Sequence, residues 1–370
     1  MASSRRAFDA LLSTLSEIGD RFAGPEWGIG SPDDQAEALR AALHQLATGL
    51  ETQFEDDPAH PVFREIVTPW RKVLGDNPDA RYHDAIVHPG GVYRIRGNAG
   101  GAVYVSFTVE EGPADGSMPT RTAGVLNDGD FDIDGDGEFE IVVGGAPLDR
   151  GWLALTPEAS RLTARHYWED LIPPATPPAP SLGLTIELID GQVPSASLPP
   201  DDESVAGSIH RLARFVRSRT LESLPPPGTT DPPAFVSQMP NEFPPPVPPG
   251  DHPLAAADAV YAMAPYLLGP DDALVMRVRW PACRYGGVAL WNRQLQTFDY
   301  LRGRVGLNRE QATTDPDGVA TVVIAHRDPG VPNWLTTEGR AFGLVFWRFL
   351  LVDGDVDPIT AEVVPVSSLL

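Results

Sequence analysis

The chain has 370 residues, of which 42% are hydrophobic, and its formal net charge is −23. This length and composition predict a globular protein with two domains or one large double unit. Proteins that bind phosphate backbones need basic stripes, so the charge argues against nucleic acid and anionic membranes as partners. The single cysteine, Cys283, excludes an internal disulfide and a thiolate metal cluster.

Residues 1–75 are expected to form an N-terminal helical region. Apolar residues recur at helical spacing over 8–22 and again over 39–54. Ser31 is a suitable N-cap for the second helix, since a proline and two aspartates follow it. A third, shorter helix is expected near 63–73. The apolar faces of these helices should pack on a sheet.

Nothing in the sequence resembles a membrane anchor or an export signal. The N-terminal segment is amphipathic and has no uninterrupted apolar run before a small-residue cleavage site. The longest apolar stretches, 254–268 and 341–352, are too short to span a bilayer. We therefore expect a cytoplasmic protein.

From Gly91 onward the hydrophobic period becomes that of β-strands, separated by Gly, Asp and Pro turns. A first β-unit is predicted over 76–172 and a second over 254–370. Strands without alternating long helices predict a mainly β fold, with a duplicated antiparallel β-sandwich or jelly-roll-like core. Strands are expected at 92–96, 101–109, 139–143, 162–168, 274–279, 288–291, 321–325, 344–351 and 361–366.

Between the two β-units, 173–253 is a proline-rich insert with one helix predicted over 204–224. Its prolines cannot join a central strand ladder and favour extended conformations. We expect ordered arms anchored by Phe235, Met239 and Phe243, and flexible linkers are the alternative.

An internal repeat supports this division of the chain. The Leu-Asn pairs at 126 and 307 each precede an Asp-Gly turn and then a Trp-Leu pair, which begins at Trp152 in one copy and at Trp334 in the other. Both tryptophans are expected to be core anchors. Residues kept in both copies should serve the scaffold, so residues found in one copy are the better candidates for chemistry.

The aspartate-rich turn of the first copy invites a calcium interpretation. Asp132, Asp134 and Asp136 match the first half of an EF-hand loop, but Val143 occupies the twelfth position, where a glutamate is required. A hairpin turn is therefore favoured over a metal site. No dinucleotide or phosphate-loop motif is present, and no cofactor is expected.

The candidate catalytic residues are two short clusters. His326 ends a predicted strand, with Asp328 two residues later, and neither has a counterpart in the first copy. Such a histidine is a candidate general base, and a capping role is the alternative. Tyr82 and His83, in the connection before the first strand, form a second candidate acid–base pair.

Aromatic and amide side chains suggest a ligand pocket. Candidate substrate-binding residues are Trp291, Asn292, Tyr300, Asn308, Asn333 and His166. Strand alternation predicts that Arg165 and Tyr167 lie on one face, with His166 and Trp168 on the other. Packing is the alternative role for each of these residues.

These motifs also carry a family resemblance. Trp291-Asn292, Leu307-Asn308, the run 325–330 and the run 332–335 are similar to the domain-of-unknown-function family numbered 1214, which is related to the family numbered 1254. The resemblance covers about 274–353 and implies a β-sandwich or jelly-roll scaffold without an established reaction. Members often have Asp and His where this chain has Thr336 and Arg340.

Three functional hypotheses follow. The first is a cofactor-independent enzyme, a hydrolase or lyase, that acts by acid–base chemistry on a small, largely apolar molecule such as a terpenoid, steroid or lipid derivative. The second is a saccharide-active or saccharide-binding protein that uses aromatic stacking. The third is a non-catalytic binding or structural module. A small-molecule ligand is the expected partner, and the sequence also allows a homo-oligomer.

Overall fold

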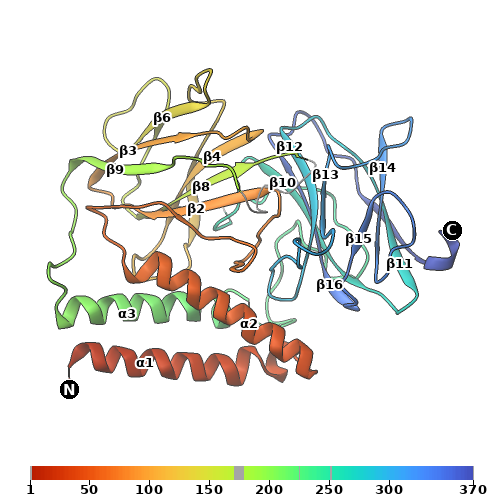
Figure 1. The fold of residues 1–370 in the computed structure, drawn as a ribbon, viewed down its shortest axis with the longest axis horizontal. Helices are drawn as coiled ribbons and strands as arrows, with labels where there is room; N and C mark the ends of the chain where they lie inside the picture. Colours follow the sequence, from red (N-terminus) through yellow and green to blue (C-terminus); the bar gives the residue numbers. More distant parts are fainter. Residues whose placement is uncertain (1, 171–178, 225, 251, 370) are drawn as a thin grey trace.

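The structure, a computed structural model, describes residues 2–170, 179–224, 226–250 and 252–369. It is mainly β, with 32% of residues in strands and 20% in helices, and it contains four sheets. Figure 1 shows two β-units side by side, with a layer of helices along one side of the molecule. The three long helices are α1 (Ser3–Glu17), α2 (Pro32–Gly49) and α3 (Asp202–Arg217).

Each long helix ends in one wide, π-helical turn. These turns are Ile18–Phe22, Leu50–Phe54 and Ser218–Glu222. Short 3₁₀ turns occur at Pro25–Trp27 and Val366–Ser368. π-Helical turns are uncommon and often lie at functional sites.

The helix starts follow from local capping. The Ser31 side chain accepts a hydrogen bond from the Asp34 amide at the start of α2, which confirms the predicted N-cap. At α3, Asp201 and Ser204 form a reciprocal capping box, in which each side chain accepts from the other residue's amide. The helix predicted within the insert is thereby confirmed.

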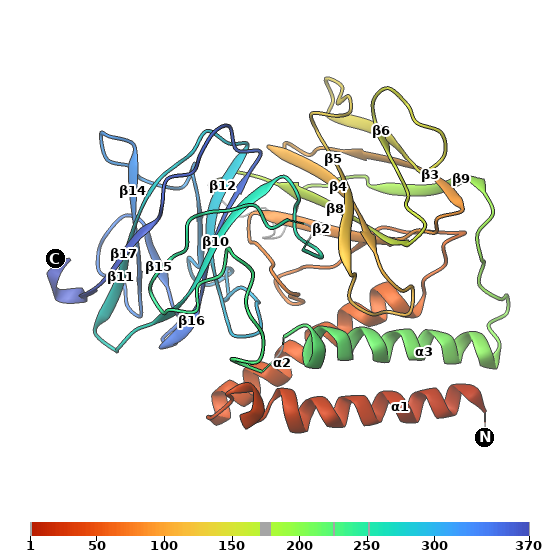
Figure 2. The ribbon, with the colours of Figure 1, turned by 180° about the vertical axis from the view of Figure 1, so that it is seen from behind.

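The helical layer brings the insert back onto the N-terminal region. α1 and α3 lie side by side in both views (Figures 1 and 2), and Leu11 and Phe22 pack in one apolar cluster with Leu212. α2 buries mainly small residues, whereas Leu39 and Leu43 are 40% and 61% exposed. The leucines at helical spacing therefore do not mark the buried face of α2.

The third N-terminal helix that we expected is absent. Residues 63–73 instead contain the two-residue strand β1 (Arg64–Glu65) and an isolated bridge between Thr68 and Arg71. Pro69 lies inside this bridge, and a proline in this position disfavours a helix.

The first β-unit consists of two sheets. One has the strand order β1-β2-β8-β4-β5 and the other β7-β6-β3-β9. All pairs are antiparallel except β6–β7. Their bounds are β2 (Ala80–Ile86), β3 (Gly91–Asn98), β4 (Tyr104–Glu111), β5 (Arg121–Asn127), β6 (Glu138–Val143), β7 (Trp152–Leu153), β8 (Ala159–Tyr167) and β9 (Thr185–Gly191).

The second β-unit also consists of two sheets. Their strand orders are β10-β16-β12-β13 and β15-β14-β11-β17, and only β14–β15 is parallel. Their bounds are β10 (Ala259–Leu267), β11 (Asp272–Arg279), β12 (Tyr285–Trp291), β13 (Gly306–Asn308), β14 (Val319–Ala325), β15 (Trp334–Thr336), β16 (Phe342–Leu350) and β17 (Thr360–Pro365).

The two units match strand for strand. If β2 corresponds to β10 and β9 to β17, both sheets of the second unit repeat the order of the first, apart from the additional edge strand β1. Trp152 and Trp334 begin the short parallel strands β7 and β15, and both are partly buried. Each indole N–H donates to a backbone carbonyl, that of Gly144 at 2.8 Å and that of Ala325 at 3.2 Å.

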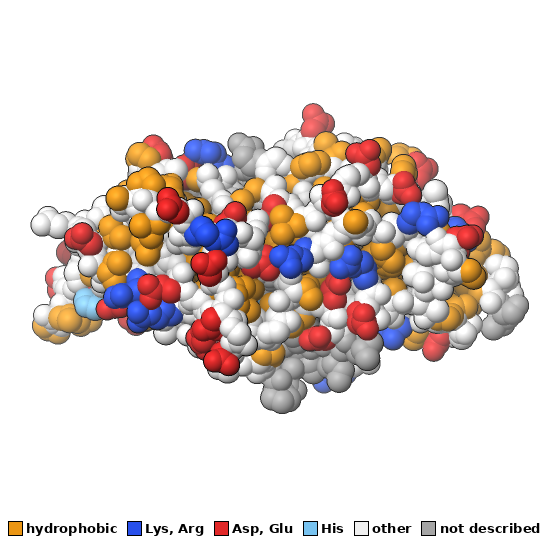
Figure 3. Space-filling view, turned by 90° about the horizontal axis from the view of Figure 1, so that it is seen from above, with side chains coloured by type: hydrophobic (Ala, Val, Ile, Leu, Met, Phe, Trp, Pro, Cys, Tyr) orange, Lys and Arg blue, Asp and Glu red, His pale blue; other side chains and the backbone are white. Residues whose placement is uncertain are grey.

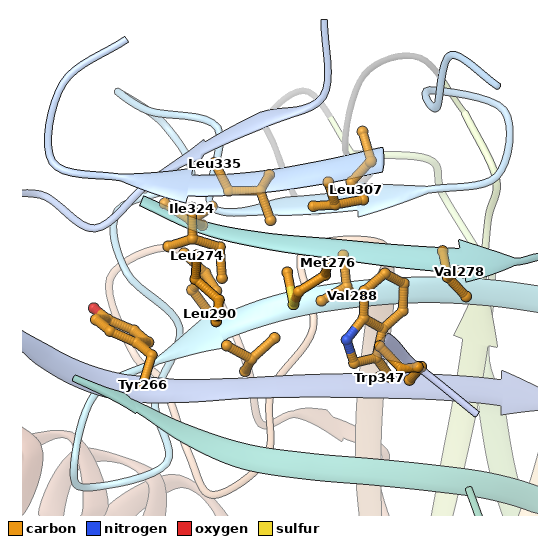
Figure 4. Close-up of a cluster of buried hydrophobic side chains, with 14 of the residues drawn as sticks. Tyr266, Leu274, Met276, Val278, Val288, Leu290, Leu307, Ile324, Leu335 and Trp347 are labelled. Carbon is orange, nitrogen blue, oxygen red and sulfur yellow. The ribbon is translucent and has the colours of Figure 1, made fainter. Parts of the chain in front are cut away.

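Each unit has an apolar core between its two sheets. In the second unit, Leu274 and Met276 of β11 face Leu290 of β12 and Trp347 of β16 (Figure 4). In the first unit, Phe107 and Phe139 pack with centroids 5.7 Å apart. Alternating inward residues on facing strands supply both cores.

Parts of the predicted insert belong to the β-units. β9 lies within it and pairs with β3, and Val236 and Val247 form isolated bridges to β10. Phe235 is buried, whereas Met239 is 58% exposed and does not act as an anchor. Phe243 packs against the core of the second unit. The insert residues 173–178 lie outside the described residues.

The face of the molecule opposite the helices is mixed in character. Acidic, basic and hydrophobic side chains are interspersed there (Figure 3). In the described part of the chain, no helix combines the length and the apolar character needed to cross a membrane.

Candidate functional site

The structure does not join His326 and Asp328. His326 Nδ1 lies 2.5 Å from the Thr337 hydroxyl, whereas the Asp328 carboxylate accepts a hydrogen bond from the Gly330 amide in its own exposed turn. Neither side chain lines a described cavity. Asp328 therefore holds its own turn, whereas His326 contacts the segment that follows β15.

Most candidate binding residues also have structural contacts. The Asn292 side-chain oxygen Oδ1 accepts from two backbone amides of its own turn, and the Asn333 side chain bridges the backbone of Thr313 and Thr321. Asn308 is fully buried and donates to the Asp170 carbonyl at 3.2 Å. These amides hold loops in place.

The aromatic candidates have similar roles. Trp291 stacks on Phe346 with centroids 4.4 Å apart, and its indole N–H donates to the Asp76 carbonyl at 2.8 Å. Tyr300 lies under the Lys72 ammonium, 4.4 Å from the ring centre, and lines a separate cavity of about 140 Å³. Trp291 therefore packs between the β-units.

His83 and His166 lie on the face of their sheet that points into the first core. Their rings are 6.5 Å apart, and His166 stacks on Trp168 with centroids at 6.1 Å. Burial lowers the pKa of His83 to about 4 and that of His166 to about 3, so both imidazoles are neutral at physiological pH. The predicted alternation along β8 is confirmed, because Arg165 and Tyr167 line a cavity on the opposite face.

This cavity has a volume of about 100 Å³. It lies where the face of the first unit that carries β2 and β8 meets the helical layer and the second unit. Such a volume accommodates several water molecules or a small ligand. Its walls combine aliphatic, aromatic and polar side chains, and they include Ile66, Val67, Val73, Leu74, Phe215, Thr48, Gln53, Tyr82, Tyr167, Tyr261, Arg161, Arg165, Arg219 and Arg348.

Two of the three π-helical turns contribute to these walls. Thr52 and Gln53 come from the turn after α2, and Arg219 comes from the turn after α3. A wide turn moves side chains away from the regular helical face, which aims these three residues at the sheet.

The cavity takes equivalent residues from both β-units. Tyr82 on β2 pairs in register with Arg165 on β8, and Tyr261 on β10 pairs in register with Arg348 on β16. All four line the cavity, and among the predicted catalytic residues only Tyr82 does so. The residues that converge here are thus present in both copies, unlike the copy-specific residues that we had favoured.

The electrostatic environment of the two arginines differs. Arg165 lies 3.6 Å from the Glu110 carboxylate and donates to Thr108 at 2.6 Å. Arg348 Nη1 donates to the hydroxyls of Tyr82 at 3.0 Å and Tyr167 at 2.8 Å. Within the described residues, no carboxylate oxygen lies within 4 Å of Arg348.

Two other charged groups around the cavity have close partners. Arg161 forms ion pairs with Asp56 and Asp84. Asp76 accepts from the amide and the hydroxyl of Thr297, and burial raises its pKa. The described residues contain no cluster of three or more His, Cys, Asp or Glu that could hold a metal ion.

Sequence reasoning missed most of this site. Arg348 belonged only to the family resemblance, through Trp347-Arg348, and was given no role, while Tyr261 gave no motif and the strand β10 was not predicted. The available signal was the repeat itself, because Ala-x-Tyr opens both β2 and β10 and an arginine sits two residues before the end of both β8 and β16.

The fold and cavity define a mainly β protein with four sheets and a buried polar cavity beneath a helical cover. No protein-family model matches the chain, and no curated protein matches it. Similar solved structures include an uncharacterised protein from Burkholderia cenocepacia, which is 27% identical, with 98% of this chain and 97% of that chain covered and a TM-score of 0.81. Another, from Vibrio parahaemolyticus, is 12% identical, with 78% of this chain and 90% of that chain covered and a TM-score of 0.48. The first similarity extends over both β-units and the helices.

Proposed function

We propose that this chain binds a small, largely apolar organic molecule in the cavity between its β-units and helices. The observation that carries the proposal is the cavity itself, in which an aliphatic patch of Ile66, Val67, Val73 and Leu74 lies beside converging polar and charged side chains. Ligand sites commonly have this composition. A saccharide ligand that stacks on tryptophan or tyrosine is the alternative. No tryptophan among the described residues lines this cavity, so tyrosines such as Tyr82, Tyr167 and Tyr261 would have to supply the stacking.

If the chain is an enzyme, Tyr82 is the candidate for acid–base chemistry. It lines the cavity, and burial raises its pKa, so the phenol is protonated at neutral pH and can donate a proton or a hydrogen bond. His83 points into the first core and cannot assist it there. A hydrolase or lyase without a cofactor stays our proposal for the reaction class.

We also propose how the two β-units arose and where the protein is located. We infer that the two units arose by duplication of one β-sandwich or jelly-roll-like domain, since they share strand order and the Tyr–Arg register. We also propose that the chain is a member of the domain family numbered 1214 and that it is located in the cytoplasm. Its partner is a small molecule, and we do not expect it to bind nucleic acid or membrane.

The experiment fills the cavity. Thr163 lines it from β8, and the equivalent position on β16 is Phe346, so this strand position can carry a phenylalanine. Thr163→Phe should abolish ligand-induced thermal shifts while the protein stays folded. Thr360→Phe, at an exposed position on β17, adds the same ring elsewhere and serves as the control.

The screen should contain apolar acids and alcohols, steroids, terpenoids and oligosaccharides. Thermal stabilisation by apolar compounds that is lost in Thr163→Phe supports the proposal. Stabilisation by oligosaccharides alone favours the saccharide alternative. No response to any class contradicts ligand binding and leaves a structural module.

A further inference from the structure

Arg348 is a buried charge, and no carboxylate oxygen of the described residues lies within 4 Å of it. Asp76, which lines the same cavity, interacts with it at longer range, because the guanidinium partly offsets the rise that burial causes in the pKa of that carboxyl. Arg348 is 6% exposed. Its guanidinium lies 5.6 Å from the ring centres of Tyr167 and Tyr261 and 4.9 Å from that of Phe346. Beyond the two tyrosine hydroxyls, Nη2 donates to the Gly75 carbonyl at 3.2 Å, and Nε has no partner in the described structure. Arginine is rarely buried to this extent without a carboxylate.

The difference between the two units explains why Arg348 is unpaired. Glu110, which neutralises Arg165, lies opposite Arg161 on β8, and the matching pair in the second unit is Trp291 opposite Leu344. The second unit therefore has an indole at the position where the first has a carboxylate. Arg348 keeps the charge while its surroundings become apolar.

A second guanidinium in the cavity is also uncompensated. Arg219 lies 3.7 Å from the Phe215 ring centre and donates to the Gly116 carbonyl and the Ser218 hydroxyl, with no carboxylate oxygen within 4 Å among the described residues. Burial lowers its pKa to about 9. Arg219 and Arg348 are thus two cavity arginines without a carboxylate within 4 Å, while the Asp76 and Asp84 carboxylates line other parts of the same cavity.

The tyrosines beside Arg348 supply a further donor. The hydroxyls of Tyr82 and Tyr167 are 3.0 Å apart and both accept from Arg348. One hydroxyl proton can bridge the two oxygens, and the other has no acceptor among the described residues. Burial raises the pKa of both phenols, so both protons are present at neutral pH.

We propose that the cavity binds an organic carboxylate, whose anionic group is recognised by Arg348 and the unused tyrosine hydroxyl and whose apolar body packs against Val67, Val73 and Leu74. This inference rests on the proposed function and specifies its ligand. A carboxylate suits the site because guanidinium and carboxylate pair through charge-assisted hydrogen bonds, and one uncompensated guanidinium beside the tyrosines matches one negative charge.

The test compares acids with their neutral amides. Benzoate and hexanoate are titrated against benzamide and hexanamide on the full-length chain, with binding measured by calorimetry and thermal shift. We expect the acids to bind about 10- to 100-fold more tightly than the amides, which is the usual contribution of a hydrogen bond to a charged group. Thr163→Phe should abolish binding of the acids.

Two variants test whether Arg348 recognises the carboxylate. Arg348→Met should reduce acid binding to the level of the amide, whereas Arg302→Met, at a side chain that is 88% exposed, should leave it unchanged. If Arg348→Met does not fold, Arg348→Gln, which keeps a polar side chain but removes the charge, should likewise reduce acid binding to the level of the amide.

The outcomes separate the two proposals. Equal binding of acids and amides, with both lost in Thr163→Phe, would overturn the carboxylate inference and keep the cavity as the ligand site. Acid binding that survives Thr163→Phe would place the anion elsewhere and contradict both. Absence of binding by all four probes would overturn the carboxylate inference, and the broader screen would then decide the proposed function.

Discussion

The sharpest stability prediction concerns His166. Its side chain is fully buried and neither ring nitrogen has a hydrogen-bond partner in the described structure. An unsatisfied buried polar atom costs about 1–3 kcal/mol. His166→Leu keeps a similar volume beside Phe139 and Trp168 and should therefore raise the free energy of unfolding by about 1–3 kcal/mol at pH 8.

The same substitution should change the pH dependence. Burial is the main cause that lowers the pKa of His166, from an ordinary 6.5 to about 3, so below pH 6.5 the unfolded chain binds a proton that the folded chain does not. Stability from the neutral imidazole is then lost as pH falls, by about 2 kcal/mol between pH 8 and pH 5. His166→Leu removes this contribution, so its advantage over the wild type should be about 2 kcal/mol larger at pH 5.

Urea unfolding followed by tryptophan fluorescence at pH 8 and pH 5 measures both effects. His210→Leu, at an exposed position on α3, is the matched control and should follow the wild type. If His166→Leu is less stable than the wild type at pH 8 and loses as much stability on acidification, the imidazole is not an unpaired neutral group and this reasoning is wrong.

Three further predictions follow from buried or turn residues. Burial raises the pKa of Asp79 to about 7, so the free energy of unfolding of the wild type should fall as pH rises from about 4 to 7. Asp79→Asn should remove this pH dependence, which urea unfolding at several pH values measures. An unchanged slope would contradict the assignment. Trp152→Ala and Trp334→Ala should each lower the free energy of unfolding by about 2–3 kcal/mol in urea titrations, because both indoles are partly buried and each donates a hydrogen bond to a backbone carbonyl. Clearly unequal losses would argue against equivalent units. Calcium added after chelation should leave the melting temperature unchanged, since the Asp134 carboxylate already accepts from two backbone amides of its turn; a concentration-dependent rise would refute this.

Local patterns predicted the three long helices and nine of the 17 strands in the described residues, and β2 is among the strands that they missed. This strand is buried on both faces, so Arg81, Tyr82, His83 and Asp84 show no alternation of polar and apolar residues. The alternation rule describes a strand with one wet face. Here the inward side faces the first core and the outward side faces the cavity, so polar residues occur on both.

The candidate site was predicted less well, for a related reason. Copy-specific residues such as His326 were favoured, yet the described cavity is built where equivalent strands of the two units meet. Arg348 contacts Tyr82 across 266 residues of sequence. A contact of this kind depends on how two units dock, which no local pattern in the chain encodes.

The exchange of Glu110 for Trp291 between the units has a consequence for how a ligand would lie. Two identical domains associating about a twofold axis would present each Tyr–Arg pair twice, and a molecule across the axis could bind in two equal orientations. In a single chain that arose by the proposed duplication, each half can change alone. One arginine is already neutralised by its own unit and the other is not, so a ligand spanning the interface meets two different walls and has one preferred direction.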